Sequence, residues 1–283
     1  MKRYFSIVFL CVFVVGSLWA QEPTKPSFEK RVYQNGNNTY VHKALPLFLY
    51  FSTSQDATAT KYLLKSNTTG KYANPMYLDT EGVNFIRHRW AVEQSTGKTI
   101  NPKIEVKFEI FADGLAPVTN SKFSGAPTYF SGGKVYYGKG LEINLSSKDA
   151  VSGLEKTHYS LNGAAYNGYT NTLTSFTEGS NNLYYFASDN VGNAEKTRIK
   201  SFIYDISAPV TNSQINGIKY GDNILSPRTT ISLPSTDNLS GLNRTLYNFD
   251  SGSDKRYSGP VKLSHLSDGD HTIYYYSYDN VKN

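Results

Sequence analysis

The chain has 283 residues, one cysteine and a formal net charge of +6 at pH 7, with 29 Lys and Arg against 23 Asp and Glu. It contains no basic run of the kind that binds nucleic acid, so its charge indicates no partner. Because the single cysteine, Cys11, lies near the start, the rest of the chain holds no disulfide, cysteine–metal site or cysteine nucleophile.

Residues 1–20 are predicted to be an export signal peptide. Lys2 and Arg3 form its positive end, residues 7–18 its apolar stretch, and Ala20 supplies a small residue before the cleavage point. The apolar stretch is too short to span a bilayer as a helix. The alternative is a lipid anchor on the cysteine inside this stretch, but the small residues that precede a lipidated cysteine are missing. The mature chain is therefore expected to be exported.

Beyond this segment the sequence repeats itself about every 90 residues, which indicates an array of small domains. Three stretches return in the same order, at offsets of 92, 88 and 90 residues: Ala116–Ser121 as Ala208–Ser213, Asp149–Leu154 as Asp237–Leu242, and Ser188–Asn193 as Tyr278–Asn283. The repeat predicts three domains, at residues 21–113, 114–205 and 206–283.

Between the repeated stretches, apolar residues alternate with polar ones, as half-buried strands require. Leu141, Ile143 and Leu145 share one expected face, matched by Ile231 and Leu233 in the next copy. A second face is formed by Thr157, Tyr159 and Leu161, matched by Thr245, Tyr247 and Phe249. The mature chain shows no convincing helical period. An all-β fold is therefore predicted, with a β-sandwich of about seven strands in each complete copy.

Turns and aromatic runs complete this expected pattern. Asn162-Gly163 predicts a tight hairpin turn, because both residues tolerate positive φ. Leu183–Phe186 and Ile273–Tyr276 are expected to be short aromatic strands. In paired tyrosines such as Tyr184-Tyr185, one ring is expected in the core and the next on the surface.

The first copy is divergent. Thr80–Gly82 matches Thr177–Gly179, and Lys61-Tyr62 lies opposite His158-Tyr159 at the same offset. The first copy lacks the two aspartate motifs of the other copies and holds Trp90, the one tryptophan outside the signal segment.

The third copy stops where the second continues. The second copy runs on through Glu195–Tyr204, an expected last strand, whereas the sequence ends at Asn283. This indicates a third domain that lacks its last strand in the sequence at hand. The alternative is a sandwich with an open edge that a neighbouring strand pairs with.

The run Asp268–Ser277, followed by Asp279-Asn280-Val281, resembles bacterial immunoglobulin-like repeats of exported proteins. More narrowly, it is similar to the tandem repeats of leptospiral outer-membrane surface proteins, a family labelled an outer-membrane β-barrel domain. The resemblance implies tandem immunoglobulin-like domains, association with the outer membrane or cell surface, and, as in some members, binding to host extracellular-matrix proteins. The expected strands of about 5–7 residues indicate sandwiches, since a barrel strand needs about 9–11.

The recurring acids are the candidate site residues. In an immunoglobulin-like sandwich, the pole where the chain enters also carries the B–C and F–G loops. Asp113 precedes the first strand of the second domain, Asp149 lies in its expected B–C loop and Asp189 in its F–G loop, so the three are expected to meet. The third domain repeats this trio as Asp205, Asp237 and Asp279. Calcium, which takes six to eight oxygen ligands, is the one cofactor the pattern suggests. The alternative is that these acids cap turns through their own backbone.

The sequence assigns no catalytic residue. None of its five histidines has a spacing suited to zinc, and no Gly-rich phosphate loop or Ser–His–acid arrangement is recognisable. An enzyme is therefore not expected. The leading expectation is an adhesin-like binding module for extracellular matrix, with a structural spacer or an accessory region of a larger secreted enzyme as alternatives.

Overall fold

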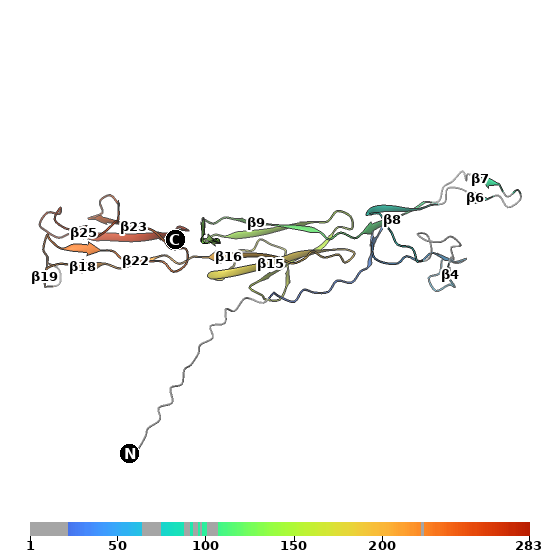
Figure 1. The fold of residues 1–283 in the computed structure, drawn as a ribbon, viewed down its shortest axis with the longest axis horizontal. Helices are drawn as coiled ribbons and strands as arrows, with labels where there is room; N and C mark the ends of the chain where they lie inside the picture. Colours follow the sequence, from blue (N-terminus) through green and yellow to red (C-terminus); the bar gives the residue numbers. More distant parts are fainter. Residues whose placement is uncertain are drawn as a thin grey trace, which may run out of the picture.

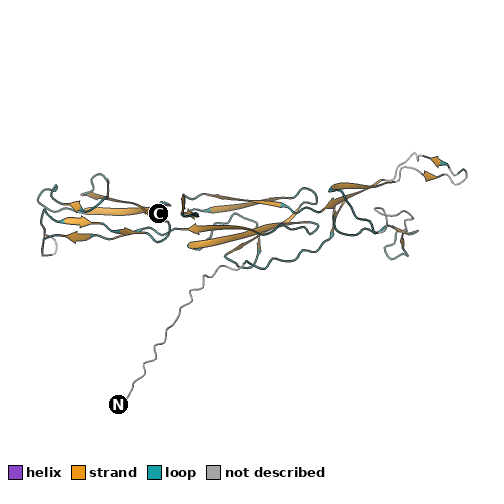
Figure 2. Cartoon of the chain, viewed as in Figure 1, coloured by secondary structure: helices purple, strands orange, loops and turns teal. Residues whose placement is uncertain are grey.

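The computed structural model describes residues 22–63, 75–87, 91–92, 96, 98–100, 107–221 and 224–283. Every regular element among these residues is a β-strand, so the fold class is all-β (Figure 2). The expected signal peptide and Trp90 lie outside the described residues. The part of the chain that is described forms no helix of the length and apolar character needed to cross a membrane.

Each described sheet draws all its strands from one of three stretches of chain, called here the first unit (residues 21–113), the middle unit (114–205) and the third unit (206–283). The units follow one another along the long axis of the molecule (Figure 1). The segment between two units is short, so the last residue of one unit lies beside the loops of the next.

The middle unit is a sandwich of two sheets. The larger has the strand order β10-β11-β16-β15-β13-β14, and the smaller pairs β12 with β9. The strands are β9 (Val118–Ser124), β10 (Thr128–Ser131), β11 (Lys134–Tyr137), β12 (Glu142–Lys148), β13 (Leu154–Leu161), β14 (Asn167–Gly168), β15 (Gly179–Asp189) and β16 (Arg198–Tyr204).

The core of the middle unit lies between these two sheets. Leu141, Ile143 and Leu145 are buried there, which confirms the predicted apolar face, because side chains two residues apart point to the same side of a strand. They pack against residues of β15 and β16, among them Leu183 and Phe202. The expected aromatic strand at residues 183–186 is the centre of the much longer β15.

The first unit repeats part of the large sheet. Its four-stranded sheet has the order β1-β2-β8-β5, in which β2 and β8 run parallel just as β11 and β16 do. These strands are β1 (Val32–Asn35), β2 (Asn38–His42), β5 (Gly82–Arg87) and β8 (Lys107–Asp113), and two small pairs are β3 (Tyr50–Phe51) with β4 (Tyr62–Leu63) and β6 (Ala91–Val92) with β7 (Thr99–Ile100).

The predicted match between residues 80–82 and 177–179 is visible in hydrogen bonds. Asn84 Nδ2 donates to the carbonyls of Thr80 and Gly82 at 2.8 and 3.0 Å, and Asn181 Nδ2 donates to the corresponding carbonyls in the middle unit at 2.6 and 3.0 Å. The predicted match of Lys61-Tyr62 to His158-Tyr159 is wrong. Tyr62 lies in β4 and pairs with Phe51, whereas His158 pairs with β15 in the large sheet.

The described residues of the third unit form four small sheets. Their pairings are β17-β22, β18-β21-β25, β19-β20 and β24-β23-β26. The strands are β17 (Val210–Thr211), β18 (Gln214–Asn216), β19 (Lys219–Tyr220), β20 (Ile224–Leu225), β21 (Thr230–Ser232), β22 (Ser235–Thr236), β23 (Leu242–Phe249), β24 (Lys255–Arg256), β25 (Val261–Lys262) and β26 (Ile273–Asp279).

The pair β23–β26 repeats β13–β15 closely, because in both pairs the register shifts just after the first residue of the earlier strand. Ile231 and Leu233 are buried, as the repeat predicts. Among the described residues, β26 pairs with β23 alone, whereas β15 pairs with both β13 and β16.

Asn162 and Gly163 adopt the positive φ values that the sequence predicts, but they do not form a tight two-residue hairpin. Both residues have positive φ, 54° and 79°, and the amide of Ala164 donates to the carbonyl of Leu161 at 3.1 Å. The pairing of β13 with β14, however, begins only at Tyr159, so the connection is a wider loop.

The N-terminal segment, residues 22–31, lies on the outer face of the middle unit. The ring of Phe28 packs edge-on against Phe186, and the Nζ of Lys25 lies 4.6 Å from the centre of the same ring. Tyr185 is buried in the core between the two sheets, and Tyr184, which shares the outer face of β15 with Phe186, is also buried, at 2% and 4% exposure respectively. The expectation that one of these two rings lies on the surface is therefore wrong, since the outer face of β15 is itself covered.

His158 lies under this segment and is expected to make stability depend on pH. Burial lowers its pKa, and the positive charges of Lys156 and Lys25 act in the same direction. Because the folded state then binds the proton less readily than the unfolded state, stability should fall as the pH drops through the ordinary histidine pKa of about 6.5. His158→Phe should reduce this loss, as measured by urea unfolding between about pH 5 and 8 with near-ultraviolet circular dichroism.

His271 supplies the control for this measurement. A hydrogen bond to Asp250 raises the pKa of His271, so its contribution to stability is full at low pH and is lost as the pH rises through the raised value. Replacing His271 by asparagine should therefore change the slope of unfolding free energy against pH in the direction opposite to that caused by His158→Phe. An identical pH slope in the wild type and in His158→Phe would contradict the expectation.

Candidate functional site

The six predicted aspartates form two clusters, one at each joint between units. Each residue of a cluster offers one carboxylate oxygen, and these oxygens lie within 4.8 Å of one another. The members of the first cluster are Asp113, Asp149 and Asp189, and those of the second are Asp205, Asp237 and Asp279. In each cluster two side chains are buried and the middle one in sequence is partly exposed. The predicted gathering of the acids is thus seen at both joints.

Loop geometry at the first joint explains part of this gathering. Asp189 ends β15, and its Oδ1 accepts hydrogen bonds from the amides of Val191, Gly192 and Asn193 at 2.8–3.0 Å. Asp189 therefore caps its own turn, as the turn-capping alternative predicts. Asp149 does so with its Oδ2, which accepts bonds from two amides of the following turn at 3.0 and 2.8 Å.

Asp113 differs because it joins units. It is the last residue of β8 and is fully buried. Its Oδ2 accepts a 2.9 Å bond from the amide of Ser152, in the loop after β12. Asn193 Nδ2 donates to Asp189 Oδ2 at 2.7 Å and to the carbonyl of Asp113 at 3.2 Å. Asp113 thereby connects the first unit to two loops of the middle unit.

The second joint repeats this arrangement. Asp205 Oδ2 accepts a 2.8 Å bond from the amide of Ser240, and Asn283 Nδ2 donates to Asp279 Oδ2 at 2.9 Å and to the carbonyl of Asp205 at 2.8 Å. Both hydrogen bonds from the loop to Asp237 reach its Oδ1. The asparagine that ends the motif Asp-Asn-Val-x-Asn thus bridges the two units, a role that the sequence analysis did not assign.

The two joints differ at one atom. Asp113 Oδ1 accepts bonds from the amide of Leu115 at 3.2 Å and from Asn193 Nδ2 at 3.4 Å. The corresponding atom, Asp205 Oδ1, is buried and has no hydrogen-bond partner among the described residues. The amide of Ser207, which stands where Leu115 stands in the first joint, bonds to Glu178 instead.

Burial shifts the electrostatics of both clusters. It raises the pKa of Asp189, and the neighbouring charge of Asp113 adds to this rise. Burial also raises the pKa of Asp205, opposed by the hydrogen bonds from Ser240 and supported by the charge of Asp237. Carboxylates crowded in this way are stabilised by a nearby positive charge.

The first joint has an imidazole beside its cluster. His42 ends β2 and is only 8% exposed; burial lowers its pKa, and the charges of Asp189 and Asp113 oppose this lowering. The amide of His42 bonds to the carbonyl of Arg31 as that of Gly138 bonds to Pro127, so a glycine occupies the matching place at the second joint. His42 was not predicted as a site residue, because the repeat contains no second histidine at this place.

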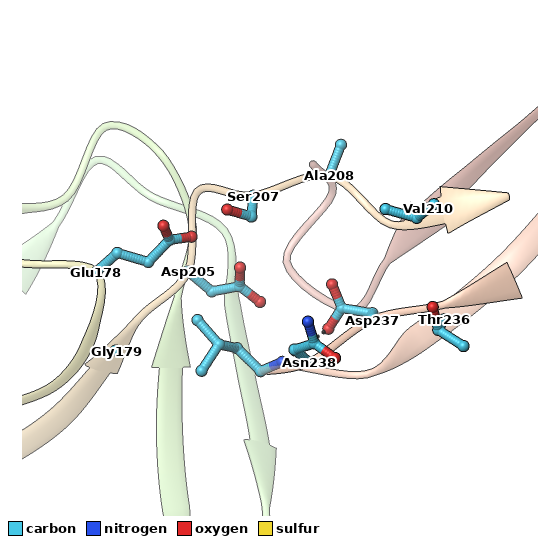
Figure 3. Close-up of a pocket in the computed structure, with 10 residues that line it drawn as sticks. Glu178, Gly179, Asp205, Ser207, Ala208, Val210, Thr236, Asp237 and Asn238 are labelled. Atoms are coloured by element: carbon cyan, nitrogen blue, oxygen red, sulfur yellow. Dashed lines mark hydrogen bonds between the residues drawn. The ribbon is translucent and has the colours of Figure 1, made fainter.

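A pocket of about 330 Å³ opens at the second joint. Figure 3 shows the carboxylates of Asp205 and Asp237 pointing toward each other, with Asn238 beside them. Glu178 and Ser207 line the same pocket. The arrangement therefore presents oxygen atoms from both units to one open space.

Comparisons with known proteins add no assignment: the chain matches no protein-family model, and no curated protein matches it.

Proposed function

We propose that the chain is an exported, non-catalytic binding protein of the bacterial outer membrane or cell surface, adhesin-like in action. The supporting observation is its form, with β-rich units in succession along one axis and each joint tied by a buried aspartate (Figure 1). A rod of this form holds its binding surface away from the point at which it is attached to the cell. Immunoglobulin-like identity for the units and a host extracellular-matrix partner are parts of this proposal, and both rest on the sequence resemblance.

Exposed aromatic rings support a binding role. On β26, Tyr274 is 50% and Tyr276 38% exposed, while Tyr275 between them is only partly exposed. In the middle unit Phe130 is 68% exposed. Rings held on strands provide contact area at low cost in conformational entropy, which is why aromatic residues are enriched at interfaces.

The proposal is tested by binding of purified residues 21–283 to immobilised fibronectin, elastin and collagen. We expect saturable binding to at least one of them. If the rings of β26 form the contact, the double variant Tyr274→Ala, Tyr276→Ala should weaken binding by about tenfold or more, the effect of losing an interface hot spot. Phe130→Ala removes an exposed ring from the middle unit; if the contact lies on β26, this variant should bind as the wild type does.

The same rod form also fits a spacer that holds another component of the envelope. Protease shaving of intact cells separates the two functions, because an adhesin must be exposed. Absence of saturable binding to all three matrix proteins, together with protection from protease, would favour the spacer.

A further inference from the structure

We infer that the second joint binds a calcium ion through Asp205, Asp237 and Asp279, and that the first joint, despite its equivalent aspartates, does not. This inference goes beyond the proposed matrix-binding function and does not depend on it.

The first step is the buried oxygen of Asp205. This side chain is fully buried, and its Oδ1 has no hydrogen-bond partner among the described residues. A buried carboxylate oxygen without a partner is strongly disfavoured, because it has lost its water and gained nothing in return. A cation beside Oδ1 supplies the missing interaction.

The second step is the position of the other two acids. One oxygen from each of the three carboxylates lies within 4.8 Å of the others. Calcium–oxygen distances of about 2.3–2.6 Å place two ligands of one ion up to about 5 Å apart, so the cluster has a fitting size. Asp237 adds an oxygen that its loop does not use, since both of its loop hydrogen bonds reach Oδ1.

The third step is the choice of ion. All three ligands are carboxylate oxygens, which hard cations prefer, and the cluster includes no histidine or cysteine of the kind that zinc selects. The adjoining pocket of about 330 Å³ leaves room for waters to complete six to eight ligands (Figure 3). Irregular, oxygen-rich coordination of this kind favours calcium over magnesium, which demands near-ideal octahedral geometry.

In the first joint, the aspartate that corresponds to Asp205 has no oxygen without a hydrogen-bond partner. Both oxygens of Asp113 accept hydrogen bonds, from Ser152, Leu115 and the side chain of Asn193. No oxygen of Asp113 therefore needs a cation as a partner.

Calcium would then act as a cross-link between units. Asp205 follows the last strand of the middle unit, whereas Asp237 and Asp279 belong to loops and strands of the third. An ion held by all three would fix the angle between these units while leaving the first joint unaffected.

The test is titration of the mature chain, stripped with chelator, with calcium chloride in a calorimeter. We expect one ion per chain, with a dissociation constant of about 10⁻⁴–10⁻³ M, the range of extracellular calcium modules. Asp237→Asn should weaken binding at least tenfold. Its matched control is Asp149→Asn, the equivalent loop position at the first joint, which should bind as the wild type does.

Hydrogen exchange gives a second readout that does not depend on the heat signal. Calcium should slow exchange at residues 237–241 and 279–283 in the wild type and in Asp149→Asn, but not in Asp237→Asn. Because Asp237 is partly exposed, its replacement leaves the buried residues of the joint in place. Binding of no ion, binding of two ions per chain, or an equal loss in both variants would overturn the inference. Matrix binding is measured separately, so its failure leaves this result unaffected.

Discussion

Replacing Phe186 by alanine is expected to destabilise the middle unit by about 3–5 kcal/mol, the range for removing a buried aromatic ring. Phe186 has no exposed surface. Its ring stacks on His158 at 4.6 Å between centres and meets Tyr166 and Phe28 edge-on at 4.9 and 5.8 Å. These contacts lie outside the space between the two sheets, so the variant also loosens the N-terminal segment.

Urea unfolding gives the free energy of this change, and hydrogen exchange along β15 assigns it to the middle unit. The matched control is Tyr276→Ala, at the corresponding place in β26. Tyr276 is 38% exposed and its hydroxyl donates to Asp254, so its loss is expected to cost about 1–2 kcal/mol, less than the loss of Phe186. Faster proteolysis within residues 22–31 should accompany Phe186→Ala alone. Equal costs for the two variants would show that the N-terminal segment does not bury Phe186 in solution.

The difference in burial between Phe186 and Tyr276 shows which part of the packing could be predicted from the sequence. Alternation with period two predicts which face of a strand is apolar, and Leu141 and Ile143 are indeed buried. It does not predict what covers the opposite face. Phe186 is buried because Phe28 and Lys25, from a segment far earlier in the chain, pack over this face of the sheet, and no local pattern encodes this contact.

The strand pairing in the divergent first unit could not be predicted from the sequence either. The tyrosine shared by Lys61-Tyr62 and His158-Tyr159 suggested a strand like β13, yet Tyr62 pairs with the nearby Phe51. One identical residue carries little information, whereas the match at Thr80–Gly82 is supported by the hydrogen bonds of Asn84 and Asn181. Strand register follows from the hydrophobic pattern of the facing strands and from the geometry of the turns more than from isolated identities.

The positions of the clustered aspartates were more predictable than the hydrogen-bond partners of their carboxylate oxygens. Loop positions in a repeated sandwich place the aspartates at one pole, because strand connectivity sets where loops emerge. The contrast between Asp113 and Asp205 was not predictable, since it depends on whether one backbone amide turns toward the aspartate or toward Glu178. The choice goes with a difference in residue type, because the hydroxyl of Ser207 also bonds to Glu178 and Leu115 has no such group, but the repeat does not show that this difference changes the partner of the aspartate.

Replacing Asp189 by alanine is expected to cost the middle unit about 3–5 kcal/mol and to loosen the first joint. Its buried carboxylate accepts bonds from three successive amides and from Asn193 Nδ2. Removal leaves these donors without a partner in a region closed to water, and each hydrogen bond to a charged group contributes about 1.5–3 kcal/mol, only partly additively. The carbonyl of Val191, which accepts a bond from the amide of Arg31, should lose its place as well.

Asp189→Asn separates the hydrogen bonds from the charge. Asparagine keeps an oxygen for the three amides but sets an NH₂ group against the NH₂ of Asn193. Burial raises the pKa of Asp189, so the fold disfavours its charge, and a neutral side chain of the same shape removes that part of the cost. The asparagine variant should therefore unfold at a urea concentration between those of the wild type and of Asp189→Ala. If Asp189→Asn were as unstable as the alanine variant, the bond between Asn193 and Asp189 would outweigh the three amides in holding the joint.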